Sequence, residues 1–180
     1  VDENRRITKY YDREGILTLY IEEKKTFKKG YPRWVKHGEM RNYENGRLSA
    51  ITSYANGENH GKFEHYGPEG EILTSGRVHK GKPVGVIKRF YENGQLQSID
   101  QKDFTIYWQG DTGIVENGWQ KRWAENGQLT YATLKDMGQS VYSATYSEEG
   151  VLLERTYQIH GIQWSQAYYP KGELQSDIIH

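Results

Sequence analysis

Residues 86–99 read Val86-Ile87-Lys88-Arg89-Phe90-Tyr91-Glu92-Asn93-Gly94-Gln95-Leu96-Gln97-Ser98-Ile99, and this stretch decides the fold. Two short segments with β-forming residues flank the pair Asn93-Gly94. Asn-Gly is the strongest short-range hairpin signal, because both residues of a tight hairpin turn must tolerate a positive φ. The stretch therefore predicts a β-hairpin, and the same Asn-Gly signal occurs at residues 45–46, 56–57 and 126–127.

The elements of this stretch recur seven times along the chain. Each copy has an aromatic residue, a glycine three or four positions later, and an aliphatic residue two positions after the glycine. The glycines are Gly15, Gly46, Gly70, Gly94, Gly127, Gly150 and Gly172. The aromatic residues are Tyr11, Tyr43, Tyr66, Tyr91, Trp123, Tyr146 and Tyr169, and the aliphatic residues are Leu17, Leu48, Ile72, Leu96, Leu129, Leu152 and Leu174. The glycine spacings of 31, 24, 24, 33, 23 and 22 residues indicate a unit of about 23 residues with two insertions of roughly eight to ten.

A second set of glycines lies between the first, at Gly38, Gly61, Gly85, Gly118 and Gly161. It predicts turns that lead from one unit into the next, so that each unit holds two strands and two turns. Glycines interrupt every apolar 3.6-residue period before it reaches ten residues, which argues against helices. A two-stranded unit cannot bury its own apolar face, so the units must be stabilised by stacking on their neighbours.

These features predict an all-β fold, an elongated repeat array of about seven two-stranded β-hairpin units forming a twisted antiparallel meander sheet. We expect a single domain over residues 1–180, with the insertions at about residues 22–36 and 100–117. The turns that keep only the glycine, at residues 69–70, 149–150 and 171–172, should be longer than the Asn-Gly turns or of another type.

Composition narrows the class of partner. Only 35% of the residues are hydrophobic, yet 13% are aromatic, which indicates a thin folded structure rather than disorder. Twenty-four basic and twenty-four acidic residues give a net charge of zero, which disfavours nucleic acid and makes a membrane surface the less favoured partner. The chain has no cysteine, so disulfides and thiolate chemistry are excluded.

Three stretches resemble the signature of bacterial MORN-repeat variants: residues 43–48, 90–96 and 123–129. The segments 57–61 and 81–85 are similar to the inter-unit turns of the same family. The resemblance extends from about Tyr10 to Gln175 and implies an antitoxin or immunity protein, the type commonly described for this variant. The eukaryotic arrays of the wider family imply a second possibility, a peripheral membrane or scaffolding array that binds anionic lipid or assembles protein partners.

Motifs for catalysis and for metal binding are absent from the sequence. It has no HExxH, phosphate-loop, GxSxG or calcium-loop pattern. Three of the six histidines, His37, His60 and His160, directly precede a glycine of the second set, which indicates a structural position in the repeat. We therefore expect no enzymatic activity, no catalytic residues, no cofactor and no metal.

Two groups of aromatic residues have different expected roles. The row that recurs once per unit is expected to stack along the sheet in place of a core. A second group falls outside the repeat register, in or beside the two insertions: Tyr31, Arg33, Trp34, Tyr107, Trp108 and Trp119. Aromatic residues and Arg are enriched at interface hot spots, so we expect these six to bind a partner. The alternative is that they hold the insertions against the sheet.

The leading hypothesis is a binding protein that neutralises a cognate toxin or secreted antibacterial effector by covering its active site. A basic cluster beside the first insertion, Lys24, Lys25, Lys28 and Lys29, could meet an acidic partner, and it is the best support for the membrane alternative. The first residue is Val1 rather than Met and cysteine is absent, which favours a periplasmic or exported protein, with the cytoplasm as the alternative.

Overall fold

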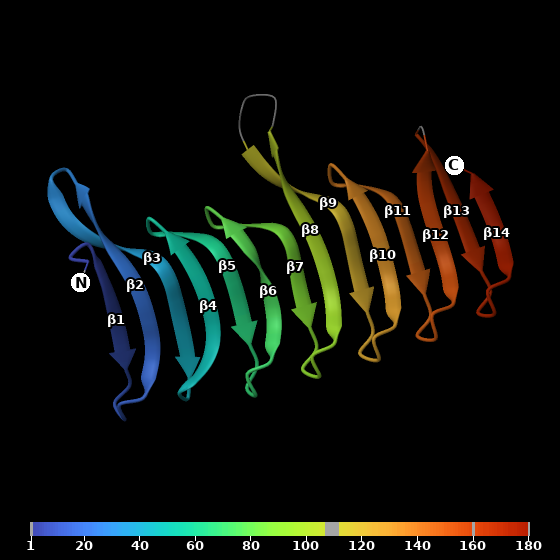
Figure 1. The fold of residues 1–180 in the computed structure, drawn as a ribbon. Coiled ribbons are helices and arrows are strands. Elements are labelled where there is room, and N and C mark those ends of the chain that lie inside the picture. Colours follow the sequence, from blue (N-terminus) through green and yellow to red (C-terminus); the bar gives the residue numbers. More distant parts are fainter. Residues whose placement is uncertain (1, 107–111, 160, 180) are drawn as a thin grey trace. The chain divides into compact units, whose positions relative to one another are not determined.

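The computed structural model describes residues 2–106, 112–159 and 161–179 and is all-β within them. Fourteen antiparallel strands follow one another in the sheet in the order of the sequence (Figure 1). This meander confirms the predicted fold class, including the seven hairpins. The chain divides into two compact units, residues 1–83 and 84–180.

The first unit holds β1 to β6. Their bounds are β1 (Arg5–Tyr11), β2 (Leu17–Lys28), β3 (Tyr31–Glu44), β4 (Arg47–Ala55), β5 (Glu58–Tyr66) and β6 (Ile72–His79). The boundary between the units follows Pro83 and therefore falls within β7. Its strands are β7 (Lys82–Phe90), β8 (Leu96–Ile106), β9 (Thr112–Trp123), β10 (Leu129–Asp136), β11 (Gln139–Tyr146), β12 (Leu152–Ile159), β13 (Ile162–Tyr168) and β14 (Leu174–Ile179).

The aromatic and aliphatic residues of the repeat face each other next to the loop that closes each hairpin. The seven cross-strand pairs are Tyr11–Leu17, Tyr43–Leu48, Tyr66–Ile72, Phe90–Leu96, Trp123–Leu129, Tyr146–Leu152 and Tyr168–Leu174. All seven predicted aliphatic positions are confirmed. Two aromatic positions were wrong, because Phe90 and Tyr168 pair with the aliphatic residue, whereas Tyr91 and Tyr169 are the first residues of the loops.

The predicted turn at Asn93-Gly94 has a different conformation. Six hairpins, this one included, close with a five-residue loop in which the glycine N–H donates to the carbonyl three residues earlier. Asn93 is not among the residues with positive φ; its Oδ1 accepts a hydrogen bond from the Gln95 N–H at 2.9 Å. Asn126 does the same with Gln128 at 2.9 Å. The asparagine side chain thus caps a longer loop, so these two turns match the glycine-only turns.

Two-residue turns with positive φ at both positions occur at Asn45-Gly46 and Asn56-Gly57, as predicted. The same geometry occurs at Lys29-Gly30, Lys80-Gly81 and Met137-Gly138, where the sequence lacks the asparagine. Lysine and methionine adopt the left-handed region there because the tight turn requires it and both side chains are exposed.

Four glycines of the second set lie inside strands rather than in turns. Gly38, Gly61 and Gly118 have positive φ within β3, β5 and β9, where the register shifts against the neighbouring strand. A Cβ on Gly61 would lie 2.8 Å from the Cβ of Ser53, so the strand passes too close for a larger residue. Gly85 lies in β7 with φ 69. The predicted inter-unit turns at Gly38, Gly61 and Gly118 are therefore bulges.

Few side chains are fully buried, as expected for a thin structure. Among the described residues, the buried apolar ones are Ile21, Ile87, Ala132 and Ala144, and the buried polar ones are Ser98, Asp100, Gln120 and Thr133. Asp100 lies between two guanidinium groups, with Arg89 at 2.6 Å and Arg122 at 2.7 Å. Cross-strand pairs and ion pairs therefore take the place of a deep core.

The two insertions lengthen two hairpins. They fall within β2–β3 and β8–β9, which project past the neighbouring strands of their own units (Figure 1). Elsewhere the hairpin strands have six to nine residues, whereas these four have 11 to 14. Each insertion thus forms a hairpin extension rather than a separate lobe.

Candidate partner-binding site

The β2–β3 hairpin ends in a ribbon that reaches beyond both neighbouring strands. On one side, the Lys25 N–H donates to the Asn4 carbonyl at 2.8 Å, just before β1 begins. On the other, the Gly57 N–H donates to the Lys36 carbonyl at 2.9 Å, just past the end of β4. Residues 25–34, which we call the β2–β3 tip, extend from these contacts to the turn at Lys29-Gly30.

The aromatic residues of the β2–β3 tip are unusually exposed. Tyr31 is 77% exposed and lies opposite Lys28, and Phe27 is 68% exposed and lies opposite Pro32. In each pair the partner is a lysine or a proline rather than an aliphatic residue that could cover the ring. The tip therefore presents apolar surface that its own unit does not bury.

Trp34 occupies the base of the tip and is half-buried. Its ring lies under the Arg6 guanidinium, 4.5 Å from the ring centroid. Arg6 is held in turn by Glu23, whose Oε2 lies 2.7 Å from the Arg6 Nε. Trp34 thus has a structural contact in addition to its exposed edge, whereas Arg33, the other predicted residue of this hairpin, is exposed.

The tip carries a dense positive charge. Residues 25–34 contain Lys25, Lys28, Lys29 and Arg33 and no Asp or Glu, and Lys24 and Lys36 flank them. The pKa of His37, beside this stretch, is lowered by burial and by the charges of Lys24 and Arg5. The pKa of Glu23 is lowered chiefly by the hydrogen bond from Arg6. Both shifts favour uncharged imidazole and charged carboxylate at the base of a cationic hairpin.

Three of the six predicted site residues belong to the other insertion. Tyr107 and Trp108 lie outside the described residues. Trp119 lies in β9 and is 39% exposed, with the Lys121 Nζ 5.0 Å from its ring centroid. Its ring also contacts Tyr142 edge-on at 5.8 Å between centroids. The structure therefore brings Tyr31, Arg33 and Trp34 together in the first unit and sets Trp119 in the sheet of the second.

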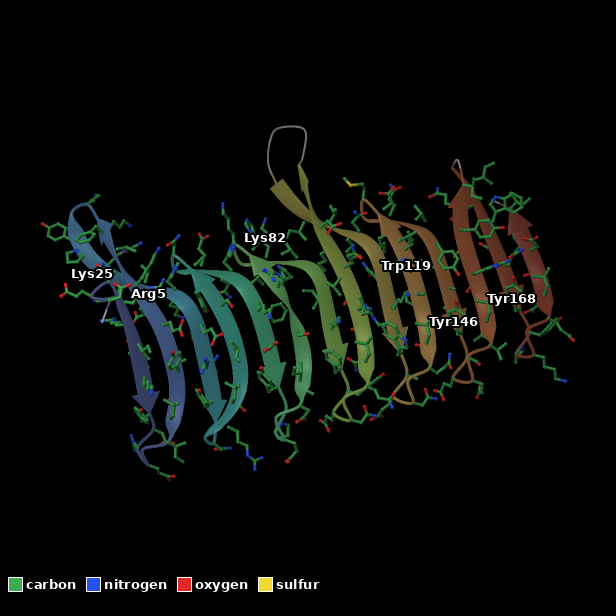
Figure 2. All side chains as sticks on the ribbon, viewed as in Figure 1. Arg5, Lys25, Lys82, Trp119, Tyr146 and Tyr168 are labelled. Atoms are coloured by element: carbon green, nitrogen blue, oxygen red, sulfur yellow. The ribbon has the colours of Figure 1, made fainter. Side chains whose placement is uncertain are left out.

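Trp119 begins an aromatic ladder that the sequence prediction missed. Successive cross-strand partners over β9 to β13 are Trp119, Leu134, Tyr142, Tyr157 and Trp164. The rings of Tyr157 and Trp164 are parallel within 1°, with 6.2 Å between their centroids. The pKa of Tyr142 is raised, chiefly by burial and next by the interaction with Tyr146. Figure 2 shows Trp119 on its strand with Tyr146 and Tyr168 of the same unit. Trp119, Tyr142 and Trp164 follow the unit spacing, at 23 and 22 residues, and the strand register shows that Leu134 and Tyr157 connect them.

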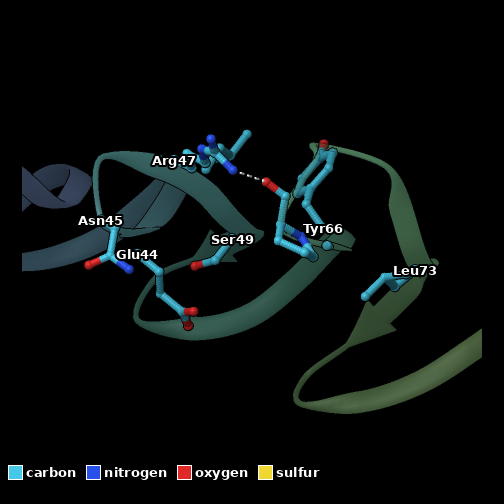
Figure 3. A pocket seen from close by; sticks show the side chains of 9 residues that line it. Glu44, Asn45, Arg47, Ser49, Tyr66 and Leu73 are labelled. Atoms are coloured by element: carbon cyan, nitrogen blue, oxygen red, sulfur yellow. Dashed lines mark hydrogen bonds between the residues drawn. The ribbon is translucent and has the colours of Figure 1, made fainter. Parts of the chain in front are cut away.

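A hollow of about 450 Å³ lies in the first unit between the β3–β4 turn and the β5–β6 loop (Figure 3). It exists because β3 and β4 are joined by two residues, where the other hairpins on this edge have five. Leu48, Tyr66 and Leu73 give it an apolar lining. The Arg47 Nη1 donates to the Pro68 carbonyl at 2.7 Å across it, so its guanidinium is already engaged.

The described residues contain neither a metal-ligand cluster nor a candidate membrane-spanning helix. Within residues 2–106, 112–159 and 161–179, no group of three or more His, Cys, Asp or Glu side chains could hold a metal ion. In the same residues no helix is both long and apolar enough to cross a membrane. The exposed tip remains the feature that the fold itself does not use.

Comparison with known proteins identifies one repeat. A family model described as a MORN repeat variant matches residues 83–101, which cover most of β7 and the start of β8. No curated protein matches the chain. A porin-like protein from Bacteroides uniformis is similar at a TM-score of 0.19 and 9% identity, over 96% of this chain and 87% of that chain. The chain therefore contains a MORN repeat variant, and such repeats are typical of arrays that bind partners.

Proposed function

We propose that this protein is an immunity protein or antitoxin, a non-enzymatic binding protein that neutralises a cognate protein toxin or secreted antibacterial effector. The observation that carries the proposal is the β2–β3 tip, which projects beyond its sheet with Tyr31 77% exposed and Phe27 68% exposed. Inhibitors of this kind act by filling or covering an active site and need no chemistry of their own.

The distribution of contacts supports assigning the interface to the tip. The aromatic residues that precede the closing loops are paired with aliphatic residues across each repeat hairpin, so they stabilise the sheet. Tyr31 and Arg33 are exposed at a place where the repeat is interrupted. Hot-spot residues are enriched in Tyr, Trp and Arg and are surrounded by contacts that exclude water, which a hairpin inserted into a cleft would provide.

The proposal extends to compartment and partner. The protein acts in the periplasm or outside the cell, where a secreted effector would reach it, or in the cytoplasm if the toxin is made in the same cell. Its partner is a protein, with neither nucleic acid nor a cofactor required.

The test uses the gene next to this one, because antitoxin and immunity genes usually lie beside their toxin. We expect the neighbouring product to arrest growth of an indicator bacterium and this protein to restore it. Tyr31→Ala should weaken the rescue, whereas Tyr169→Ala, which removes a 50% exposed tyrosine in a loop of the repeat, should leave it intact. A neighbouring product that is harmless, or that forms no complex with this protein, would refute the proposal.

A further inference from the structure

We infer that the surface that receives the β2–β3 tip is a cleft lined by carboxylates on a protein partner. The inference rests on the proposed function and adds the chemistry of the partner's site. It comes from the order in which charges and rings are placed along the tip.

Cations occupy the apex. Lys29 is in the turn itself, with φ 50, and Lys28 directly precedes it. Tyr31 lies opposite Lys28, and Phe27 lies one pair further from the turn, opposite Pro32. An approaching surface therefore meets the Lys29 ammonium group first and then the level at which Lys28 and Tyr31 stand side by side, so it needs anionic groups at its deepest point and apolar groups nearer its rim.

Cations also occupy both faces of the ribbon. Side chains alternate along a strand, so Lys28 and Arg33 share one face with Tyr31, while Lys25 shares the other with Phe27 and Trp34. A surface complementary to both faces and to the apex must surround the tip. This favours a cleft over a flat surface, and over a nucleic-acid strand, which would lie along one face.

A bilayer fits the same residues less well. Inserting Phe27 and Tyr31 into hydrocarbon would carry Lys29 in ahead of them and Lys28 in beside Tyr31, and charged groups inside the membrane are costly. A carboxylate-lined cleft pairs the lysines while its rim covers the rings. The protein's net charge of zero means that this attraction is local to the tip.

The experiment places a photo-crosslinking residue at the tip of the full chain. Tyr31→p-benzoylphenylalanine is expressed in the source cell, irradiated, and the crosslinked peptide is sequenced. We expect a peptide from a protein, with Asp or Glu beside the crosslinked position, and a yield that falls as salt is raised. An adduct to lipid or nucleic acid, or to a peptide without nearby carboxylates, would overturn the inference.

Charge reversal provides the matched control. Lys29→Asp and Lys80→Asp make the same change in the same type of two-residue turn, with φ 50 and φ 47. In the Tyr31 photoprobe background, Lys29→Asp should lower the yield by at least about tenfold and Lys80→Asp should leave it unchanged. Equal losses would indicate a general charge effect and contradict the inference. So would binding of the purified protein to vesicles of phosphatidylcholine and phosphatidylglycerol if Lys29→Asp abolished it.

A second probe position separates this inference from the proposed function. If Trp119→p-benzoylphenylalanine crosslinks to the toxin and the Tyr31 probe does not, the cleft inference fails while the proposed function stands. If neither position gives an adduct and the neighbouring product is not neutralised, both fail.

Discussion

Two tyrosines of the first unit, Tyr66 and Tyr31, occupy opposite kinds of site. Tyr66 lies next to the closing loop of a repeat hairpin, opposite Ile72, and its hydroxyl donates to the Glu64 Oε2 at 2.6 Å. Burial, followed by that hydrogen bond, raises the pKa of Tyr66 to about 12. Tyr31 stands at the β2–β3 tip, opposite Lys28, and is 77% exposed. The comparison indicates that Tyr66 stabilises the sheet, while Tyr31, where the repeat is interrupted, is available to a partner.

The largest effect on stability is expected from Tyr66→Ala. The change removes the ring opposite Ile72 and leaves Glu64 without its hydrogen-bond donor, so the free energy of unfolding should fall by about 2–3 kcal/mol. Urea denaturation measures it. Tyr66→Phe keeps the ring and should cost about 1 kcal/mol. If the two variants were equally stable, the ring would not be part of the framework.

The bulges of the framework should be less tolerant than its loops. Gly61→Ala forces a Cβ to within 2.8 Å of the Ser53 Cβ at φ +117, and we expect a loss of about 2 kcal/mol. Gly94→Ala has φ +80 with open space around the new Cβ and should cost about 1 kcal/mol. Thermal unfolding of both variants compares them directly, and a reversed order would contradict the assignment of Gly61 to a bulge.

The base of the tip should show a pH-dependent contribution from Glu23. Its pKa is lowered from the ordinary value of 4.5, so the fold favours the charged carboxylate. The resulting stability is present above pH 4.5 and is lost as pH falls through the lower, folded pKa. Glu23→Gln should therefore cost about 1 kcal/mol at pH 7 and nothing in strong acid. Urea titrations at several pH values test this, and a constant difference would exclude the ion pair with Arg6 as its source.

The smallest effect on stability is expected from Tyr31→Ala. The side chain is mostly exposed, so unfolding should change by less than about 0.5 kcal/mol, while affinity for the partner should fall by at least about tenfold. Calorimetric titration and thermal unfolding of the same sample give both values. Parallel losses of stability and affinity would place Tyr31 with the framework instead.

The sequence was sufficient for the repeat because each hairpin carries its own local signal. The aliphatic positions were found correctly, since Leu96 and its equivalents need only face the last aromatic residue of the preceding strand. The turn type at Asn93 was wrong because asparagine can adopt positive φ or cap a longer loop with its side chain, and two residues do not distinguish these. Gly38 and Gly118 were assigned to turns because the sequence alone does not distinguish a glycine in a bulge from a glycine in a turn.

The candidate site was predictable only in part. Tyr31 and Arg33 were singled out because they interrupt the repeat, and both are exposed; that they bind a partner stays a prediction. The contact between Arg6 and Trp34 depends on the pairing of β2 with β1 on one side and β3 on the other, which no local pattern specifies. The members Trp119, Tyr142 and Trp164 of the ladder follow the unit spacing, but joining them through Leu134 and Tyr157 required the register of five strands.

The central claim is that the β2–β3 tip, and not the repeating framework, binds the partner. The most direct measurement is the affinity for the neighbouring gene product of a variant in which residues 27–32 are replaced by Asn-Gly. Thr26 and Arg33 already lie opposite each other and would flank the new turn, so the sheet should keep its stability to within about 1 kcal/mol. We predict that affinity falls by at least about a hundredfold. Unchanged affinity in this stable, shortened protein would contradict the account.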